Sequence, residues 1–301
     1  MISVVIPHFN QPQMLDRCLA SLAGQAAGGH VVEVIVADNG STTSPEGIVA
    51  RHPGVRLIVE TEKGPGPARN AGIRASGGEI LAFIDADMEA SPGWLAAIAA
   101  RFDDPATQVL GGDVQILQAD PARPTALEAY ESEFSFRMEH YIRAQGFTGT
   151  GNLAMRRAVW DAVGPFAGMG VAEDRDWGHR ATAQGIRIDW VPGMLAFHPA
   201  RTTFAELARK WDRHTAHDFE LRVTGLAGRV KWIGRTLAMA LSPLAHAPRV
   251  FASSRIGGGP GTKLRAFAVL LRIRLYRAKL MASLAFAGSA DKVVSRWRNQ
   301  G

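Results

Sequence analysis

The first 90 residues alternate between two hydrophobic patterns. Short apolar runs rich in β-branched residues predict buried strands at 2–6, 31–37, 55–60 and 80–84. Apolar residues at helical spacing predict helices between them, at 11–25 and 68–75. Strands that alternate with helices about every 20 to 25 residues predict an α/β fold with a mostly parallel, doubly wound sheet.

The pattern continues beyond residue 100 with less regular spacing. It predicts strands at 109–117, 186–190 and 194–197, and helices at 125–143, 157–163, 172–184, 203–217, 230–251 and 263–287. A glycine-rich break at 257–261 separates the last two helices. We therefore expect a helical extension after the α/β domain.

Polar residues follow each of the first four predicted strands. They are His8-Phe9-Asn10, Asp38-Asn39, Glu60-Thr61 and Asp85. In open α/β sheets, ligands bind at the carboxyl ends of the strands, so these residues should converge on one crevice. Pro7 ends the first strand where a dinucleotide-binding domain would have Gly-x-Gly-x-x-Gly, so this is not the dehydrogenase pattern.

Two acids, Asp85 and Asp87, end the fourth strand with one residue between them. Two hard oxygen ligands at a strand end suit Mn²⁺ or Mg²⁺, which in turn can hold a diphosphate. Taken alone, an Asp-X-Asp sequence is more often a solvated turn. Ser91 and Pro92 follow as an expected N-cap and first-turn residue of the next helix.

Charge divides the 301 residues into two parts. Residues 222–301 hold 15 Lys and Arg against one acid, a net charge of +14, whereas 1–221 hold 19 bases and 27 acids, a net charge of −8; together they give the +6 of the whole chain. We therefore expect an acidic α/β domain at 1–221 and a basic helical extension at 222–301. Such an asymmetry favours a polyanionic partner, either a membrane or a nucleic acid.

The extension favours a membrane surface over nucleic acid. Its last predicted helix carries an apolar stripe among many bases, at Leu264, Phe267, Ala268, Leu271, Leu275 and Leu280. A basic amphipathic helix suits an anionic bilayer surface, and few aromatic residues lie among the bases to stack on nucleobases. The alternative is that the stripe packs on the α/β domain. No apolar run is long enough to span a bilayer.

The expected location is cytoplasmic, on the inner face of the cytoplasmic membrane. Cys18 is the single cysteine, which fits a reducing compartment, and the chain starts directly with a strand rather than a basic leader.

Five short motifs in order resemble the family 2 inverting glycosyltransferases of the GT-A fold. They are VVIPHFN ending at Asn10, VADNGST ending at Thr42, GPGPARNAG ending at Gly72, FIDAD ending at Asp87 and AEDRD ending at Asp176. The resemblance covers roughly residues 2–215. It implies a Rossmann-like GT-A fold and transfer of one sugar from a nucleotide-sugar, preferably a UDP-sugar, to a hydroxyl of a saccharide or lipid-linked acceptor. Cell-envelope or exopolysaccharide synthesis is the implied setting.

The resemblance also implies roles on the donor side of the site. Asp38 would receive the nucleotide base or ribose, and Pro7 and Asn10 would shape the loop beneath the base. Gly64 belongs to the glycine loop before Arg69, whose place at a helix start suits an anion. The alternatives are an Asx-turn at Asp38, strand termination at Pro7 and a surface position for Arg69.

The remaining donor-side roles concern the cation and the sugar. Asp87 would bind Mn²⁺ or Mg²⁺, Asp85 would contact ribose or metal, and His198 would be a further metal ligand. Gly151 would belong to a glycine loop beside the donor sugar. A structural histidine and a plain turn are the alternatives for His198 and Gly151.

Glu173 and Asp174 match the acidic pair of the family, in which the Asp is the catalytic base. The acceptor hydroxyl must lose its proton as it attacks the anomeric carbon, and a positioned carboxylate can accept that proton. Direct attack without a covalent intermediate inverts the configuration. The alternative is that these acids only complement the dipole of a helix start.

The chain departs from the family pattern at three points. Asn39 stands where a second acid is common, and Trp177 replaces an aliphatic residue, which would shape the acceptor pocket. The Gln-x-x-Arg-Trp signature of processive members is missing, and Arg209-Lys-Trp-Asp only faintly echoes it, so we expect addition of one sugar.

Two rival functions remain, a nucleotidyltransferase of related fold and a non-enzymatic nucleic-acid-binding protein. The first would carry a glycine-rich basic loop after strand one, which His8-Phe9-Asn10 is not. The second would show salt-sensitive DNA binding.

Overall fold

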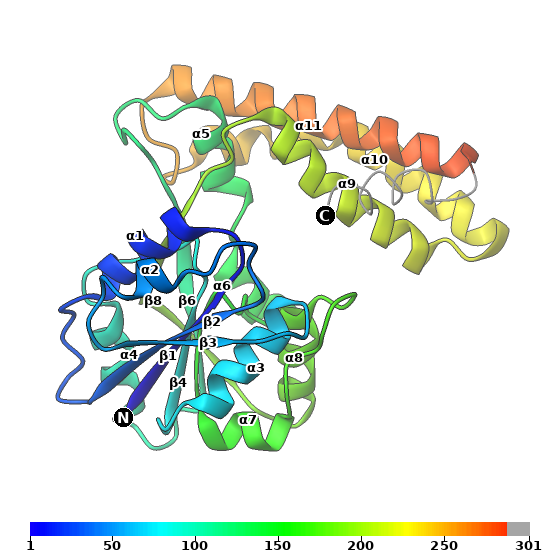
Figure 1. The fold of residues 1–301 in the computed structure, drawn as a ribbon. Helices are drawn as coiled ribbons and strands as arrows, with labels where there is room; N and C mark the ends of the chain where they lie inside the picture. The colour runs from blue at the N-terminus through cyan, green and yellow to red at the C-terminus, as the bar shows by residue number, and fades with distance from the viewer. Residues whose placement is uncertain (288–301) are drawn as a thin grey trace. The chain divides into compact units, whose positions relative to one another are not determined.

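The computed structural model describes residues 1–287, and its contacts divide the chain into two compact units (Figure 1). The sheet unit comprises Met1–Gln115 and Phe136–Pro199; the helical unit comprises Ile116–Ser135 and the described part of Ala200–Gly301. This division differs from the expected boundary at residue 221. The reason is a shared core, in which Tyr130, Leu207 and Leu270 pack together in the helical unit.

The sheet unit is built on eight strands in the order β3-β2-β1-β4-β7-β6-β8-β5. Their bounds are β1 (Ile2–His8), β2 (Val32–Asp38), β3 (Val55–Val59), β4 (Ile80–Ile84), β5 (Glu89–Ala90), β6 (Val109–Leu117), β7 (Asn152–Arg156) and β8 (Ile188–Pro199). The first four strands pair in parallel, as predicted. The pairs β4–β7, β6–β7 and β5–β8 are antiparallel, so the whole sheet is mixed.

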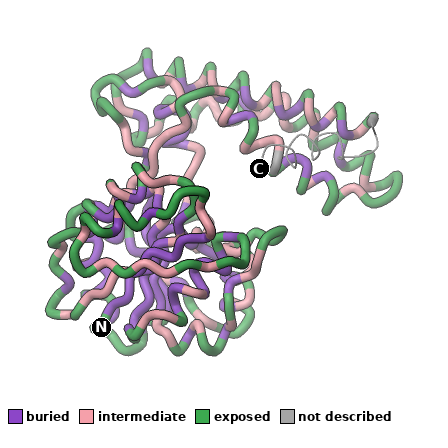
Figure 2. Tube along the Cα trace, in the orientation of Figure 1, coloured by how far each residue is buried: buried purple, intermediate pink, exposed green. Residues whose placement is uncertain are grey.

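Helices cover both faces of the sheet (Figure 1). One face packs on α1 (Pro12–Leu22), α2 (Glu46–Val49) and α4 (Trp94–Phe102), and the other on α3 (Pro65–Ala75), α7 (Arg157–Val163) and α8 (Glu173–Ala183). Alternate strand residues serve the two faces: Val4 and Ala82 lie in one core, Val5 and Phe83 in the other. The central strands β1, β4 and β7 are almost wholly buried, and Figure 2 shows buried residues concentrated in the middle of the sheet unit.

Three local predictions differ from the structure of the sheet unit. Strand β1 runs through Pro7 to His8 because its pairing with β4 has ended by Val5, so Pro7 needs no donor on that side. Helix α4 begins after Gly93, which has a φ of 88°, and not at Ser91. The two short strands expected at 186–197 are one strand, β8.

The long helix expected at 125–143 is broken into three pieces. They are α5 (Ala126–Phe134), α6 (Met138–His140) and the π-helical turn η1 (Tyr141–Gln145). Thr125 and Glu128 form a capping box at the start of α5, which fixes where the first piece begins.

The helical unit consists of α5 with α9 (Phe204–Arg222), α10 (Gly225–Ala252) and α11 (Pro260–Ala287). Helix α11 buries Ala266, Leu270 and Ile273 against α5 and α9 and packs along α10. Part of the predicted stripe of α11 stays exposed, at Leu264, Leu271 and Leu275. Within residues 1–287, no helix is both long and apolar enough to cross a bilayer.

Candidate active site

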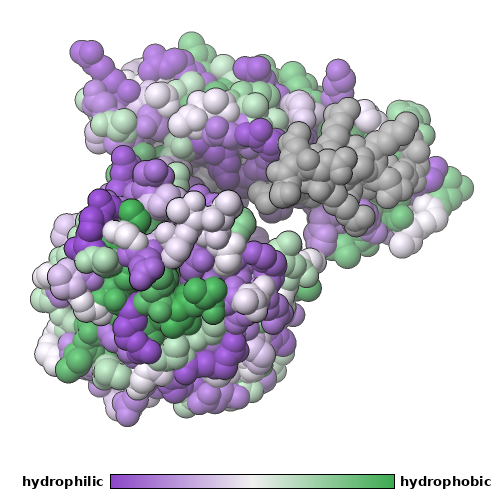
Figure 3. Space-filling model, in the orientation of Figure 1, coloured by the Kyte–Doolittle hydropathy of each residue, from purple (hydrophilic) through white to green (hydrophobic). Residues whose placement is uncertain are grey.

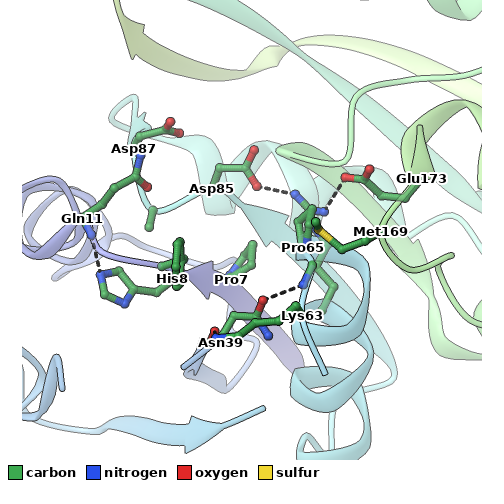
Figure 4. A pocket seen from close by; sticks show the side chains of 14 residues that line it. Pro7, His8, Gln11, Asn39, Lys63, Pro65, Asp85, Asp87, Met169 and Glu173 are labelled. Carbon is green, nitrogen blue, oxygen red and sulfur yellow. Dashed lines mark hydrogen bonds and ion pairs between the residues drawn. The ribbon is translucent and has the colours of Figure 1, made fainter. Parts of the chain in front are cut away.

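The carboxyl ends of the parallel strands open into a cavity of about 450 Å³ in the sheet unit (Figure 4). Residues that line it come from the ends of β1, β2 and β4 and from the starts of α3 and α8: Pro7, His8, Phe9, Gln11, Asn39, Lys63, Gly64, Pro65, Arg69, Asp85, Ala86, Asp87, Met169 and Glu173. Six of the predicted site residues therefore meet in one place: Pro7, Gly64, Arg69, Asp85, Asp87 and Glu173.

Arg69 joins two of the predicted acids. The residue is 2% exposed, and its terminal nitrogens donate to Asp85 Oδ1 at 2.5 Å and to Glu173 Oε1 at 3.0 Å (Figure 4). Burial alone would lower the pKa of Arg69, but the two carboxylates outweigh it and raise that pKa. Arg69 is therefore the buried link between β4 and α8, and not a surface residue.

Neighbouring residues contact both carboxylate oxygens of Asp85. Oδ1 accepts from Arg69, and a Cβ added at Gly151 would lie only 2.4 Å from Oδ2. Burial raises the pKa of Asp85, Arg69 opposes that effect, and the neighbouring charge of Asp87 adds to it. The role that the structure gives to Gly151 is to leave room for this carboxylate.

Asp87 faces His198 at the far end of β8. His198 Nδ1 lies 2.6 Å from the carbonyl oxygen of Pro199, which can only accept, so Nδ1 carries the proton. Its Nε2 lies 3.4 Å from Asp87 Oδ2. Burial would raise the pKa of Asp87, but its interactions with His198 and Gln11 outweigh it and lower that pKa.

This pair fits a divalent cation held partly by substrate. An imidazole nitrogen and a carboxylate oxygen converge there, and both are ligands that Mn²⁺ accepts. In the part of the chain that the structure describes, no three His, Cys, Asp or Glu side chains group closely enough to hold a metal alone. The remaining ligands would come from a diphosphate and water, which is the usual arrangement for Mg²⁺ at phosphate sites.

Asp38 lies beside the cavity and does not line it. Its carboxylate accepts from the Ser41 amide at 3.0 Å, the Ser41 hydroxyl at 2.5 Å and His8 Nδ1 at 2.8 Å. Burial would raise its pKa, but these hydrogen bonds outweigh it and lower the pKa. The local geometry is thus the Asx-turn alternative. Asn10 closes the same loop by accepting from the Thr42 amide.

His8 is a site residue that sequence reasoning left unassigned. Its Nε2 accepts from the Gln11 amide at 3.2 Å, so Nδ1 carries the proton that is donated to Asp38. This buried pair ties the end of β1 to the end of β2. The sequence did contain a signal for this pair, since an acid and a histidine stand at the ends of two strands that were expected to lie in the same parallel sheet.

Asn39 was expected at the crevice without a role, and Lys63 was missed as a cavity residue. Asn39 donates from Nδ2 to the carbonyl oxygens of Glu60 and Glu62, and its Oδ1 accepts from the Gly64 amide at 2.7 Å. These contacts need both the NH₂ and the C=O group of an amide side chain. Lys63 donates to the carbonyl oxygens of Asn39 and Gly40. Lys63 also places a positive charge in the cavity lining, beside Asn39 (Figure 4).

The acids at the start of α8 have different environments. Glu173 is held by Arg69, whereas Asp174 accepts only the Arg175 amide at 2.7 Å among the contacts of the described residues. Burial, with a further contribution from Glu173, raises the pKa of Asp174. Of the two, Asp174 is thus the carboxylate that is left free to take a proton.

Trp177 does not shape a pocket for an acceptor. It is buried in the core beneath α8, where its indole donates to the Gly164 carbonyl oxygen and its ring packs on Phe166. The bulky residue at this position fills the core.

The sequence of the chain matches the model of glycosyl transferase family 2 over residues 3–169. The chain belongs to this family. It is 32% identical over 215 residues to the glycosyltransferase AglE of Haloferax volcanii, covering 69% of this chain and 70% of the relative. It is 27% identical to the pre-mycofactocin glycosyltransferase of Mycobacterium tuberculosis, of which it spans 45%.

Solved structures show the same fold. TarS of S. aureus in complex with UDP-GlcNAc has a TM-score of 0.54 at 17% identity, covering 96% of this chain and 92% of that one. Glucosyl-3-phosphoglycerate synthase of Mycobacterium tuberculosis, in complex with Mn²⁺, UDP and phosphoglyceric acid, has a TM-score of 0.51 at 21% identity, covering 69% and 74%. The family 2 chain therefore has a GT-A type fold and is an enzyme that transfers a sugar from a nucleotide-sugar donor. Of the three functions considered from the sequence, glycosyl transfer is confirmed.

Proposed function

We propose that this glycosyltransferase is a metal-dependent, inverting enzyme that moves one sugar from a UDP-sugar to a hydroxyl of a saccharide or lipid-linked acceptor. The observation that carries the proposal is the arrangement of three acids in one cavity, with Asp85 and Glu173 on Arg69 and Asp87 facing His198; Asp174 directly follows Glu173 in the chain. Mn²⁺ or Mg²⁺, held by Asp87 and His198, would stabilise the negative charge of the leaving diphosphate.

The chain's own residues divide the remaining work. Arg69 holds Asp85 and Glu173 in fixed positions and neutralises part of their charge, so neither is a good base. Asp174 has no ion-pair partner among the residues that the structure describes and its pKa is raised, so it is better suited to accept the proton of the acceptor hydroxyl. No carboxylate of the enzyme has to act as a nucleophile in this scheme. The acceptor oxygen therefore attacks the anomeric carbon directly, and the configuration at that carbon is inverted.

A uracil base would sit at the end of β1 and β2. The loop there is fixed by the His8–Asp38 pair and by Asn39, and Lys63 lies beside it. Both of the structural relatives named above were solved with a uridine nucleotide, which supports UDP as the donor carrier. Cell-envelope or exopolysaccharide synthesis remains our proposal for the pathway.

For a lipid-linked acceptor, the proposed partner of the protein is an anionic membrane surface. Helix α10 exposes apolar residues three and four positions apart, at Leu226, Val230, Ile233, Leu237, Leu241 and Leu244. Arg229 and Lys231 are exposed on the same helix, and residues 222–301 carry a net charge of +14. Figure 3 shows hydrophobic and hydrophilic side chains interleaved along the helical unit. An apolar face flanked by bases matches an anionic bilayer in both hydrophobicity and charge.

The donor proposal is tested with a panel of nucleotide sugars and an acceptor mixture. We expect UDP release from one UDP-sugar in the presence of Mn²⁺ or Mg²⁺, and loss of release in EDTA. Product analysis by NMR would show an anomeric configuration opposite to that of the donor. Full activity in EDTA, or retention of configuration, would refute the metal or the inversion proposal respectively.

The membrane proposal is tested by flotation with vesicles. We expect the protein to bind vesicles that contain phosphatidylglycerol, to bind less in high salt, and to ignore phosphatidylcholine vesicles. The double variant Leu237→Glu/Leu241→Glu should stay unbound. The matched control Leu264→Glu/Leu275→Glu, on the exposed side of α11, should float like the native protein; equal loss in both variants would contradict the assignment to α10.

A further inference from the structure

The helical unit contains a second cavity, of about 380 Å³, formed by α9, α10 and α11. Its polar lining includes Thr215, Asp218, Arg222, Arg235 and Arg277. The rest of the wall is largely apolar, with Trp232, Met239 and Met281. Because it lies wholly within the helical unit, its function does not depend on the sugar-transfer proposal.

Two buried polar groups at this cavity lack partners among the residues that the structure describes. Arg277 is 8% exposed and its Nε makes no hydrogen bond; Thr215 is 2% exposed and its hydroxyl makes none. The guanidinium of Arg277 is nevertheless held in place, since its Cζ lies 3.7 Å from the centroid of the Trp211 ring. A buried donor without an acceptor is costly, so this position calls for one.

The charges around the cavity are not balanced. Three arginines line it, against one acid, Asp218, which pairs with Arg222 at 3.3 Å. Burial, together with the nearby charge of Arg274, lowers the pKa of Arg277 to about 10. At neutral pH, Arg277 is therefore a charged, desolvated group with no described carboxylate in contact with it.

We propose that this cavity binds a phosphate-class oxyanion. Arg277 would donate from its free Nε, Thr215 from its unpartnered hydroxyl, and Arg235 from the cavity rim. A tetrahedral oxyanion accepts several charge-assisted hydrogen bonds at once, and a guanidinium matches its geometry. The apolar walls suit an organic phosphate ester, which is either a lipid headgroup or a small soluble molecule.

Thermal unfolding of the full chain tests the site directly. Inorganic phosphate and glycerol 3-phosphate are compared with chloride at equal ionic strength. We expect either phosphate to raise the Tm, because a ligand that binds only the folded state stabilises it. Arg277→Met should weaken phosphate binding, measured by calorimetry, by about tenfold or more, which corresponds to the loss of a charge-assisted hydrogen bond.

A matched control separates a built site from general positive charge. Lys279→Met removes one charge from an exposed position of the same helix and should bind phosphate like the native protein. If Arg277→Met fails to fold, Arg235→Gln, at an exposed lining position, replaces it and should weaken binding as well. Equal weakening by Lys279→Met and Arg277→Met would overturn the proposal, as would the lack of any phosphate-specific rise in Tm for the native protein.

The source of the phosphate is distinguished with two probes. Vesicles with phosphatidic acid in phosphatidylcholine present the headgroup, and glycerol 3-phosphate presents the soluble ester. Two results together would show that the cavity takes both the lipid headgroup and the soluble ester. Arg277→Met would lose binding to the vesicles, and Leu237→Glu/Leu241→Glu would keep tight binding of glycerol 3-phosphate. If Arg277→Met changes only glycerol 3-phosphate binding, the ligand is a soluble ester. If Arg277→Met binds both the vesicles and glycerol 3-phosphate like the native protein, the proposed site is refuted.

Discussion

The two units of the molecule handle buried charge in opposite ways. In the sheet unit, Arg69 is buried between Asp85 and Glu173, so each charged group has a partner within the chain. In the helical unit, Arg277 is also buried but contacts an aromatic ring and no carboxylate among the described residues. The first arrangement is complete in itself, whereas the second leaves a charge that an external anion would compensate.

This difference separates charged groups that hold a cavity in shape from charged groups that can bind a ligand. Charges that neutralise each other, as on Arg69, fix the geometry of a cavity but bind a ligand weakly. A charge with no counter-charge among the described residues, such as Arg277, has the capacity to bind an ion, as does the Asp87 carboxylate together with the His198 imidazole. Variants in the two units test this difference.

Asp87→Ala should have the largest effect. The variant removes the carboxylate that we assign to the cation, and turnover should fall by about 10³-fold or more. Initial rates of nucleotide release with Mn²⁺ measure this loss. Asp189→Ala, which removes a carboxylate paired with Arg187 at the other end of β8, serves as the control and should retain its activity. A fall of less than tenfold in Asp87→Ala would remove Asp87 from the catalytic site.

Arg69→Met should destabilise the folded state by about 3–5 kcal/mol, since it leaves two shielded carboxylates without their cation. Urea unfolding at neutral pH measures this loss. Arg74→Met, which removes an exposed arginine from the same helix, is the control and should change stability by at most about 0.5 kcal/mol. If the two variants were equally stable, Arg69 would not be the structural link described above.

Asp174→Asn should lower turnover by about 10² or more and leave donor binding nearly unchanged, as expected for loss of a general base. The pKa of Asp174 is raised above its ordinary value of 3.8, so the base form is lost as the pH falls through that raised pKa. The acid limb of kcat/KM should therefore lie above the pH expected for an ordinary aspartate. A profile that is flat down to pH 4 would contradict this role.

The same variant has a consequence for stability. An acid whose pKa is raised by folding penalises the folded state once it ionises, and the penalty is present above the raised pKa. Asp174→Asn should thus be as stable as the native protein at pH 3.5 and no less stable at pH 7. Glu173→Gln, which weakens a contact with Arg69, should instead be less stable at pH 7.

Arg277→Met should show the smallest effect, and of opposite sign to Arg69→Met. Without phosphate, the variant should be more stable than the native protein by about 1 kcal/mol, because a desolvated charge is replaced by an apolar side chain. Urea unfolding in a phosphate-free buffer measures the change. A loss of stability as large as that of Arg69→Met would remove the contrast between the units.

The parallel half of the sheet and the cavity at its edge could be predicted from the sequence. Periodicity placed β1 to β4, and the rule that parallel strands share their ligand-binding edge brought Pro7, Asp85 and Asp87 together. The antiparallel half could not be predicted, because the pairing of β6, β7 and β8 depends on contacts between segments far apart in the chain.

The partners of individual side chains were also beyond the sequence. Arg69 and Glu173 are 104 positions apart, and nothing local indicates that they meet. Asp38 was expected to face the nucleotide, but His8 and Ser41 occupy its oxygens. Arg277 reads as one more base of an amphipathic helix until the packing of α9 and α10 around it is known. Its burial is a property of the helical unit as a whole.

The most direct measurement of the central claim, that Asp87 and His198 hold a cation which in turn holds a nucleoside diphosphate, is calorimetric binding of UDP with and without Mn²⁺. We expect native protein to bind UDP at least about tenfold more tightly with Mn²⁺ than in EDTA. Asp87→Ala should bind UDP equally in both conditions, with its fold intact by circular dichroism. UDP binding by the native protein that is indifferent to Mn²⁺, or a full Mn²⁺ effect in Asp87→Ala, would contradict the claim.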